Sequence, residues 1–125
     1  MSENSSGSIQ RFNVTERDLQ PGCREIQVTG ELDLAVAGKL DEVLDVAVDG
    51  AEMVLIDLER CDFIDSSGIA VILRAHHRMT ERGLRLAVHG PSDQVLRILS
   101  MTGLTSNGLV FDSAGEALAA LDGGS

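Results

Sequence analysis

Apolar and polar residues alternate along the chain with two periods, one typical of strands and the other typical of helices. Residues 25–32 alternate strictly, with the apolar positions at Ile26, Val28 and Leu32, which predicts a strand with one buried face. Residues 53–58 are apolar apart from Asp57, as in a central strand that is covered on both faces. Apolar residues spaced by three and four predict helices over 36–47, 69–79 and 95–102.

Shorter signals complete the series of strands. A first strand is predicted over 9–15, a turn over 18–22 that contains Pro21-Gly22, and further strands over 84–88 and 109–111. A short polar loop is expected between Asp57 and Phe63. Strands therefore alternate with helices after an initial strand pair. This order predicts an α/β fold in which a small mixed β-sheet, with an N-terminal hairpin and mainly parallel strands, packs with about four helices.

The ends of the predicted helices carry recognisable signals. Asp33 is expected to cap the first helix, and Gly83 suits the left-handed position after the second. Pro91 is expected near the first turn of the third helix, and Ser113 to Glu116 match a capping box before the last. No linker or repeat interrupts the chain. We therefore expect one domain over residues 9–121, with a disordered tail over 1–8 and a flexible tail over 122–125.

Composition narrows the classes of partner. Of the 125 residues, 20 are acidic and 10 are basic, so the formal net charge is −10. This balance argues against nucleic acid and anionic membranes and favours a protein with a basic face. No apolar run has the length of a membrane span, and no secretory signal is present. We expect a cytoplasmic protein in which Cys23 and Cys61 are reduced and partly buried.

The candidate chemistry lies where a strand gives way to a helix, in Asp65-Ser66-Ser67-Gly68. Free N–H groups and the helix dipole make such a position favourable for a negative charge, so a serine there is a candidate phosphate acceptor. The alternative is that Ser66 or Ser67 only caps the helix, and that Gly68 only eases the turn. Sequence alone leaves both interpretations open.

Catalysis and cofactor binding find little support. The nucleophile-elbow pattern G-x-S-x-G lacks its first glycine, and His76 and His77 lie too far along the helix to serve Ser66 as a base, although distance does not exclude His89. Adjacent histidines diverge on a helix, and the two cysteines lie far apart in sequence, so no metal site is expected. Glycine-rich phosphate-binding motifs are absent, so we expect no cofactor. Asp57 resembles the acceptor of response-regulator receivers, but the late lysine that they need is missing.

Three segments together resemble a known family, the STAS domains, and within it the bacterial anti-sigma factor antagonists. The first is Gly30-Glu31-Leu32-Asp33, the second is Asp57-Leu58 followed by Phe63-Ile64-Asp65-Ser66-Ser67-Gly68-Ile69, and the third runs from Pro91 through Val95, Arg97 and Leu99 to Gly103-Leu104. The resemblance extends from about Ile9 to Leu121. It implies the STAS fold.

The resemblance also implies a mechanism and a site. The unmodified protein would bind an anti-sigma factor that is a serine kinase and free the sigma factor, phosphorylation would end binding, and a metal-dependent serine phosphatase would restore it. Ser66 would be the acceptor, with Ser67 the second candidate. Asp33, Asp65, Ser66, Ser67 and Gly68 would form the partner-binding site of a protein that is not an enzyme. The alternative is a non-catalytic STAS adaptor subunit of a larger stress-signalling or lipid-transport complex.

Overall fold

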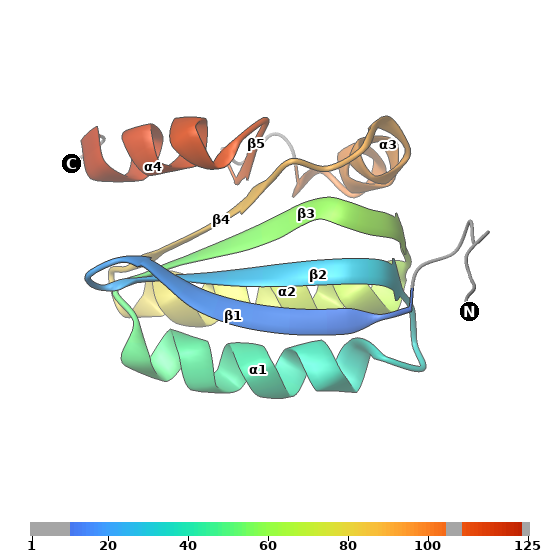
Figure 1. Ribbon diagram of the computed structural model, residues 1–125, viewed down its shortest axis with the longest axis horizontal. Coiled ribbons are helices and arrows are strands. Elements are labelled where there is room, and N and C mark those ends of the chain that lie inside the picture. The colour runs from blue at the N-terminus through green and yellow to red at the C-terminus, as the bar shows by residue number, and fades with distance from the viewer. Residues whose placement is uncertain (1–10, 105–108, 124–125) are drawn as a thin grey trace, which may run out of the picture.

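A five-stranded sheet with strand order β1-β2-β3-β4-β5 forms the centre of the molecule (Figure 1). The structure is a computed structural model that describes residues 11–104 and 109–123. β1 and β2 pair antiparallel, and every later pair is parallel, which confirms the mixed sheet with an N-terminal hairpin. The strands are β1 (Asn13–Gln20), β2 (Cys23–Leu32), β3 (Met53–Ile64), β4 (Arg85–His89) and β5 (Val110–Phe111).

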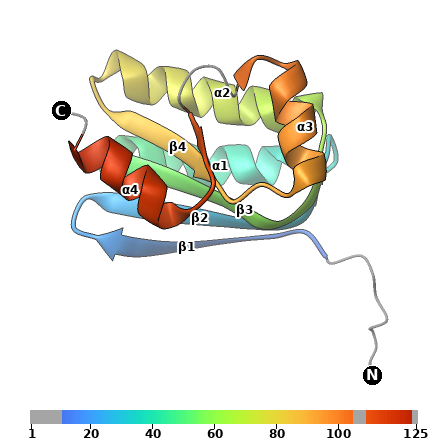
Figure 2. The same ribbon diagram turned by 90° about the horizontal axis from the view of Figure 1, so that it is seen from above.

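Helices cover both faces of the sheet. They are α1 (Ala37–Gly50), α2 (Ser66–Glu81), α3 (Asp93–Met101) and α4 (Ala114–Gly123). Two views show α1 and α2 on one side of the sheet and α4 on the other (Figures 1 and 2). The expectation of about four helices is therefore confirmed within the described residues. Among these residues, no helix is both long and apolar enough to cross a membrane.

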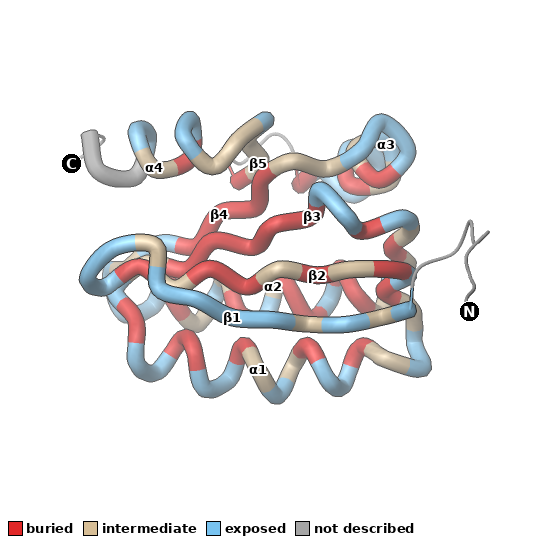
Figure 3. Tube along the Cα trace, in the orientation of Figure 1, coloured by how far each residue is buried: buried red, intermediate tan, exposed pale blue. Residues whose placement is uncertain are grey.

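The two faces of the sheet are buried to different extents. A large apolar cluster joins α1, α2 and α3 to one face, with Ile26 and Ile56 fully buried at its centre. A smaller cluster lies on the α4 side and is built around Cys23, Leu55, Ala87 and Ala117. β1 is exposed along most of its length, whereas β4 is mostly buried (Figure 3). The hydrophobic free energy of folding is therefore concentrated between the sheet and the α1–α2 pair.

Two predicted loops are strand instead. The predicted turn over 18–22 is confined to Pro21-Gly22, because β1 continues to Gln20 and pairs Asp18 with Arg24 across the hairpin. The polar loop expected after Asp57 is also wrong. β3 continues through residues 59–62 because the second half of β2 offers it a parallel partner, with two register irregularities along the way. Side-chain polarity failed as a signal here because the end of β3 extends beyond β4 and exposes the side chains of Glu59, Arg60 and Asp62.

Two predicted helix starts are also corrected. Asp33 does not cap α1, whose N-cap is Val36 with no side-chain hydrogen bond; instead Asp33 Oδ1 accepts the N–H of Ala35 at 3.1 Å, within a short turn. Pro91 precedes α3 rather than lying in its first turn, because Ser92 is the N-cap and its Oγ accepts the N–H of Val95 at 3.2 Å. In both places a short connecting segment separates the end of the strand from the start of the helix.

Other predicted ends are confirmed. Gly83 follows α2 with φ +73°, a left-handed conformation that glycine adopts without strain. The Oγ of Ser113 accepts the N–H of Glu116 at 3.2 Å at the start of α4, as a capping box requires. α4 extends to Gly123, two residues beyond the predicted end of the domain. The tail expected over 1–8, the first two residues of the predicted first strand, the side chain of Leu121 and residues 124–125 lie outside what the structure describes.

The cysteines behave as expected from the sequence. Cys23 and Cys61 are both buried, and no disulfide joins them. They belong to different apolar clusters on the two sides of the sheet. Burial raises the pKa of the Cys61 thiol to about 11. This thiol therefore stays protonated near neutral pH and is a poor nucleophile.

The packing of α1 leads to a testable prediction. Leu44 is 1% exposed in the main cluster, while Val46, two residues along, is 67% exposed. Replacing Leu44 by Ala should lower the free energy of unfolding by roughly 2–5 kcal/mol, because it leaves a cavity in a close-packed core. Val46→Ala should change it by less than about 0.5 kcal/mol. Urea unfolding followed by circular dichroism measures both, and equal effects would mean that α1 presents a different face to the sheet.

Candidate functional site

The start of α2 is held by the carboxylate of Asp65. Asp65 is the N-cap residue, and its Oδ1 accepts the N–H of Ser67 at 2.8 Å and that of Gly68 at 3.3 Å. These are two of the N–H groups that a helix start leaves without an intrahelical partner, and the negative charge also suits the positive end of the helix dipole. Asp65, rather than either serine, is therefore the capping residue of α2.

The same carboxylate fastens a second segment of the chain to this helix start. Its Oδ2 accepts the N–H of Leu34 at 3.1 Å, and the N–H of Asp65 donates to the carbonyl of Leu32 at 3.1 Å. β2 and β3 run parallel, so their C-terminal ends meet at one edge of the sheet. The structure thereby brings Asp33, in the loop between β2 and α1, together with Asp65 and the serines.

The two serines differ in accessibility. Ser66 is exposed as the first residue of α2, and Ser67 is half-buried. Within the described residues, neither hydroxyl takes part in a hydrogen bond, because the capping role belongs to Asp65. An exposed hydroxyl with no structural task can be modified at little cost to the fold. This geometry favours Ser66 over Ser67 as the group that another protein reaches.

Gly68 is required by the close approach of α2 to the sheet. A Cβ atom at this position would lie 2.6 Å from Cγ of Leu32 and 3.0 Å from Cγ1 of Ile64. Both neighbours are fully buried, so neither can move aside without disturbing the core. The role of Gly68 in the fold is therefore to let the helix start sit directly on the ends of β2 and β3.

Sequence reasoning missed Leu34. Its side chain is 78% exposed, although its backbone is tied to Asp65. Glu31 and Asp62 are also exposed, at the ends of β2 and β3 that flank the site. A large apolar side chain on an acidic surface is a common feature of a protein contact. The available signal was an apolar residue directly after Asp33 that does not fit the helical spacing of the segment that follows.

The histidines do not provide a catalytic base. His89, which sequence distance left open, is 2% exposed and its Nε2 lies 3.0 Å from Oε2 of Glu25, so it is engaged away from the serines. His76 is half-buried and His77 is exposed, as expected for adjacent residues of a helix. Burial, with a smaller contribution from His77, lowers the pKa of His76. None of these side chains activates Ser66 as a nucleophile.

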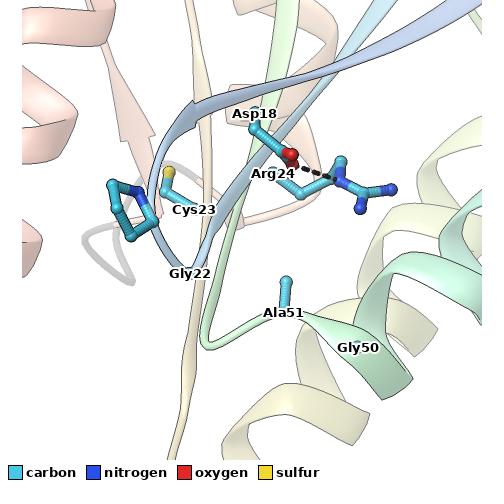
Figure 4. A pocket seen from close by; sticks show the side chains of 7 residues that line it. Asp18, Gly22, Cys23, Arg24, Gly50 and Ala51 are labelled. Carbon is cyan, nitrogen blue, oxygen red and sulfur yellow. Dashed lines mark hydrogen bonds and ion pairs between the residues drawn. The ribbon is translucent and has the colours of Figure 1, made fainter.

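A surface pocket of about 240 Å³ lies far from the serines (Figure 4). It is lined by the β1–β2 turn and by the segment between α1 and β3, including Gly22, Cys23 and Ala51. An ion pair between Asp18 and Arg24, 2.9 Å between Oδ1 and Nε, crosses its edge. These residues mark the N-terminal ends of β2 and β3, and Ser66 follows the opposite end of β3. This pocket is therefore separate from the candidate site.

Comparison with known proteins is consistent with this fold. Residues 15–111 match the family described as "Mlab, STAS domain". The chain is 35% identical over 95 residues to the anti-sigma-B factor antagonist of Listeria monocytogenes, which covers 75% of this chain and 82% of that protein. A corresponding protein of Staphylococcus aureus is 31% identical over 90 residues, covering 71% of this chain and 83% of its own length.

Solved structures share the fold at low sequence identity. The anti-sigma factor antagonist SpoIIAA in its unphosphorylated form superposes with a TM-score of 0.76 at 20% identity, covering 89% of this chain and 97% of that one. The Bacillus cell fate determinant SpoIIAA in the phosphorylated form gives a TM-score of 0.69 at 19% identity, covering 85% and 96%. The arrangement of one sheet and four helices is thus the fold of these proteins.

The capping geometry generates a prediction that separates the two interpretations of the serines. Asp65→Ala should lower the free energy of unfolding by about 1–2 kcal/mol, because it removes the cap of α2 and the tie to Leu34. Ser66→Ala and Ser67→Ala should each change it by less than about 0.5 kcal/mol. Urea unfolding of the three variants measures these differences. A loss in Ser66→Ala as large as that in Asp65→Ala would show that the serine is a structural cap.

Proposed function

The chain belongs to the STAS domain family, and we propose that it is an anti-sigma factor antagonist, a regulator that binds rather than catalyses. In its unphosphorylated form it binds a kinase-type anti-sigma factor and frees the sigma factor. The kinase then transfers the terminal phosphoryl group of ATP to Oγ of Ser66 and releases ADP. A metal-dependent serine phosphatase restores the hydroxyl.

One observation carries this proposal. The Ser66 hydroxyl is exposed at the start of α2 and has no hydrogen-bond partner among the described residues. A serine with these properties is suited to be a substrate of another enzyme. The names of the Listeria and Staphylococcus relatives support the regulatory role, and the two forms of SpoIIAA share the fold of this chain.

The contact surface has a definite chemical character. Leu34 offers an apolar side chain that is 78% exposed, and the same end of the sheet carries the carboxylates of Glu31, Asp33, Asp62 and Asp65. The complementary surface on the partner is an apolar pocket rimmed by basic side chains. Long-range attraction between that surface and a chain of net charge −10 would accelerate the encounter.

Phosphorylation at Ser66 would change affinity without changing the fold. Asp65 already occupies the N–H groups of Ser67 and Gly68, so a phosphate on Ser66 finds no free donor at those two positions and gains an acidic neighbour. Its charge of about −1.5 to −2 would remain in water in the free protein. At a contact shaped for a neutral hydroxyl, the same charge would have to be desolvated, which opposes binding.

The alternative, a constitutive adaptor subunit in a larger complex, differs in one respect that can be measured. An adaptor has no need for a free hydroxyl at position 66, and its binding would not respond to a charge there. The surface around Leu34 would serve either function. Phosphate transfer and the charge dependence of binding therefore discriminate between the two.

Phosphate transfer is the first prediction of this proposal. Incubation with the serine-kinase anti-sigma factor of the same organism and ATP should place one phosphate on the protein, and peptide mass spectrometry should locate it on Ser66. Ser66→Ala should lose the modification, and Ser67→Ala should keep it, because Ser66 is exposed and Ser67 is half-buried. Full modification of Ser66→Ala would contradict the assigned acceptor.

Binding to the same kinase is the second prediction. Leu34→Ala should raise the dissociation constant about tenfold or more, since an anchor of this size contributes roughly 1.5–3 kcal/mol when buried. Val46→Ala is the matched control, because Val46 is also exposed but lies about 13 Å along α1 from its first residue. Ser66→Asp should weaken binding strongly as well. Calorimetry measures these affinities. Parental affinity in Ser66→Asp would refute the phosphorylation switch. Parental affinity in Leu34→Ala would refute only the role of Leu34 as an anchor.

A further inference from the structure

We propose that Glu25, Asp57 and His89 form a binding site for a divalent transition-metal ion, independently of the surface around Ser66. The three side chains, the polar triad, come from β2, β3 and β4, and one potential ligand atom of each lies within 4.8 Å of the others. They are 2%, 4% and 2% exposed. Within residues 11–104 and 109–123, no other group of three metal-ligating side chains is gathered as closely.

The position of the triad follows from strand register. Cys23, Leu55 and Ala87 form the apolar cluster on the α4 side, and each is followed two positions later by a member of the triad. Because side chains alternate along a strand, the triad lies on that same face. Asp57 and His89 are direct register partners, and Glu25 reaches toward His89 from two strands away. Sequence reasoning expected no metal site because it considered only histidines and cysteines. Successive members of the triad are 32 positions apart in sequence, and only the sheet brings them together.

The triad lacks positive charge. Oε1 of Glu25 accepts from Nε of Arg17 at 2.7 Å. Oδ2 of Asp57 accepts from Nε2 of Gln27 at 3.1 Å, and Oδ1 of Asp57 accepts the N–H of Glu59 at 2.8 Å. Arg17 is therefore the one permanent cation in this network, and its own side chain is 68% exposed. Burying two carboxylates with one solvated counterion is costly, and a divalent cation would offset both charges.

The imidazole of His89 has unused bonding capacity. Its Nε2 faces Oε2 of Glu25 at 3.0 Å, while its buried Nδ1 has no hydrogen-bond partner. A neutral ring therefore leaves one lone pair unsatisfied, and a protonated ring leaves one N–H unsatisfied, and both cases are unfavourable in a buried site. Coordination of a metal ion by Nε2, the nitrogen that faces Glu25, would use the lone pair of that nitrogen and leave the ring proton on Nδ1.

The donor set indicates the kind of ion. One imidazole with two carboxylates suits Zn²⁺ or Mn²⁺ better than Mg²⁺ or Ca²⁺, which prefer oxygen ligands only. Four-coordinate zinc places its ligand atoms roughly 3.4 Å apart. Side-chain rotations that move the ligand atoms of the triad by about an ångström would therefore bring them to that spacing. The ion would enter from the side of β1, where the exposed Arg17 pairs with Glu25. Arg17 is then a competitor of the metal for Glu25.

The test uses the purified chain after treatment with a chelator. Titration with Zn²⁺ and with Mn²⁺ by calorimetry should give one saturable ion per chain and raise the melting temperature, because the ion binds only the folded state. Asp57→Asn and His89→Gln should each weaken binding at least tenfold. His77→Gln, at an exposed histidine, should bind as the parent does. Absence of saturable binding in the parent, or parental affinity in His89→Gln, would leave the triad as a buried hydrogen-bond network only.

A gain-of-affinity variant guards against loss by misfolding. Arg17→Met should bind Zn²⁺ several-fold more tightly, because it removes the competing guanidinium from Glu25. Arg24→Met is the matched control, since Arg24 pairs with Glu16 and Asp18 on the same hairpin and does not contact the triad. Weaker or unchanged binding in Arg17→Met would show that the ion sits elsewhere. The absorption spectrum of bound Co²⁺ should also lack a thiolate band, which excludes Cys23 and Cys61 as ligands.

Discussion

The carboxylate of Asp65 organises the functional end of the molecule. One oxygen caps α2 through Ser67 and Gly68, and the other holds the loop that carries Asp33 and Leu34. Two segments that are 31 residues apart in sequence are thus fixed by a single side chain at the meeting point of two parallel strands. Because this residue supplies the cap, the adjacent Ser66 is left without a structural task. A change at Ser66 can therefore alter binding, as proposed, without removing a contact that stabilises the fold.

The two faces of the sheet have taken different roles. The face under α1 and α2 is apolar and supplies most of the core, with Gly68 allowing α2 to sit directly on the strand ends. The face under α4 carries a small apolar cluster and, next to it, the polar triad. Buried charge on this face lowers stability relative to an apolar core, so its presence calls for an explanation such as the ion proposed above.

Acidic charge is distributed in accordance with these roles. At the site, Glu31 and Asp62 are exposed to water and Asp33 and Asp65 are half-buried, so part of this charge is available to a basic partner. The carboxylates of the triad are withdrawn from water and paired within the sheet. The net charge of −10 therefore describes two different kinds of acidic residue, and only the exposed kind can attract another protein.

The sequence by itself determined the order of strands and helices, the hairpin, the parallel sheet and the position of Ser66 at a helix start, because local periodicity and turn residues encode these features. It did not determine that Asp65 rather than a serine caps α2, that polar residues 59–62 continue β3, or that Leu34 is exposed, because each depends on a partner segment distant in sequence. Glu25 illustrates the limit most clearly. Its alternation with Ile26 predicted a solvent-facing side chain, and it is buried because the sheet brings His89, 64 residues away, beside it. Periodicity reports which face a residue occupies, and only the tertiary structure decides what covers that face.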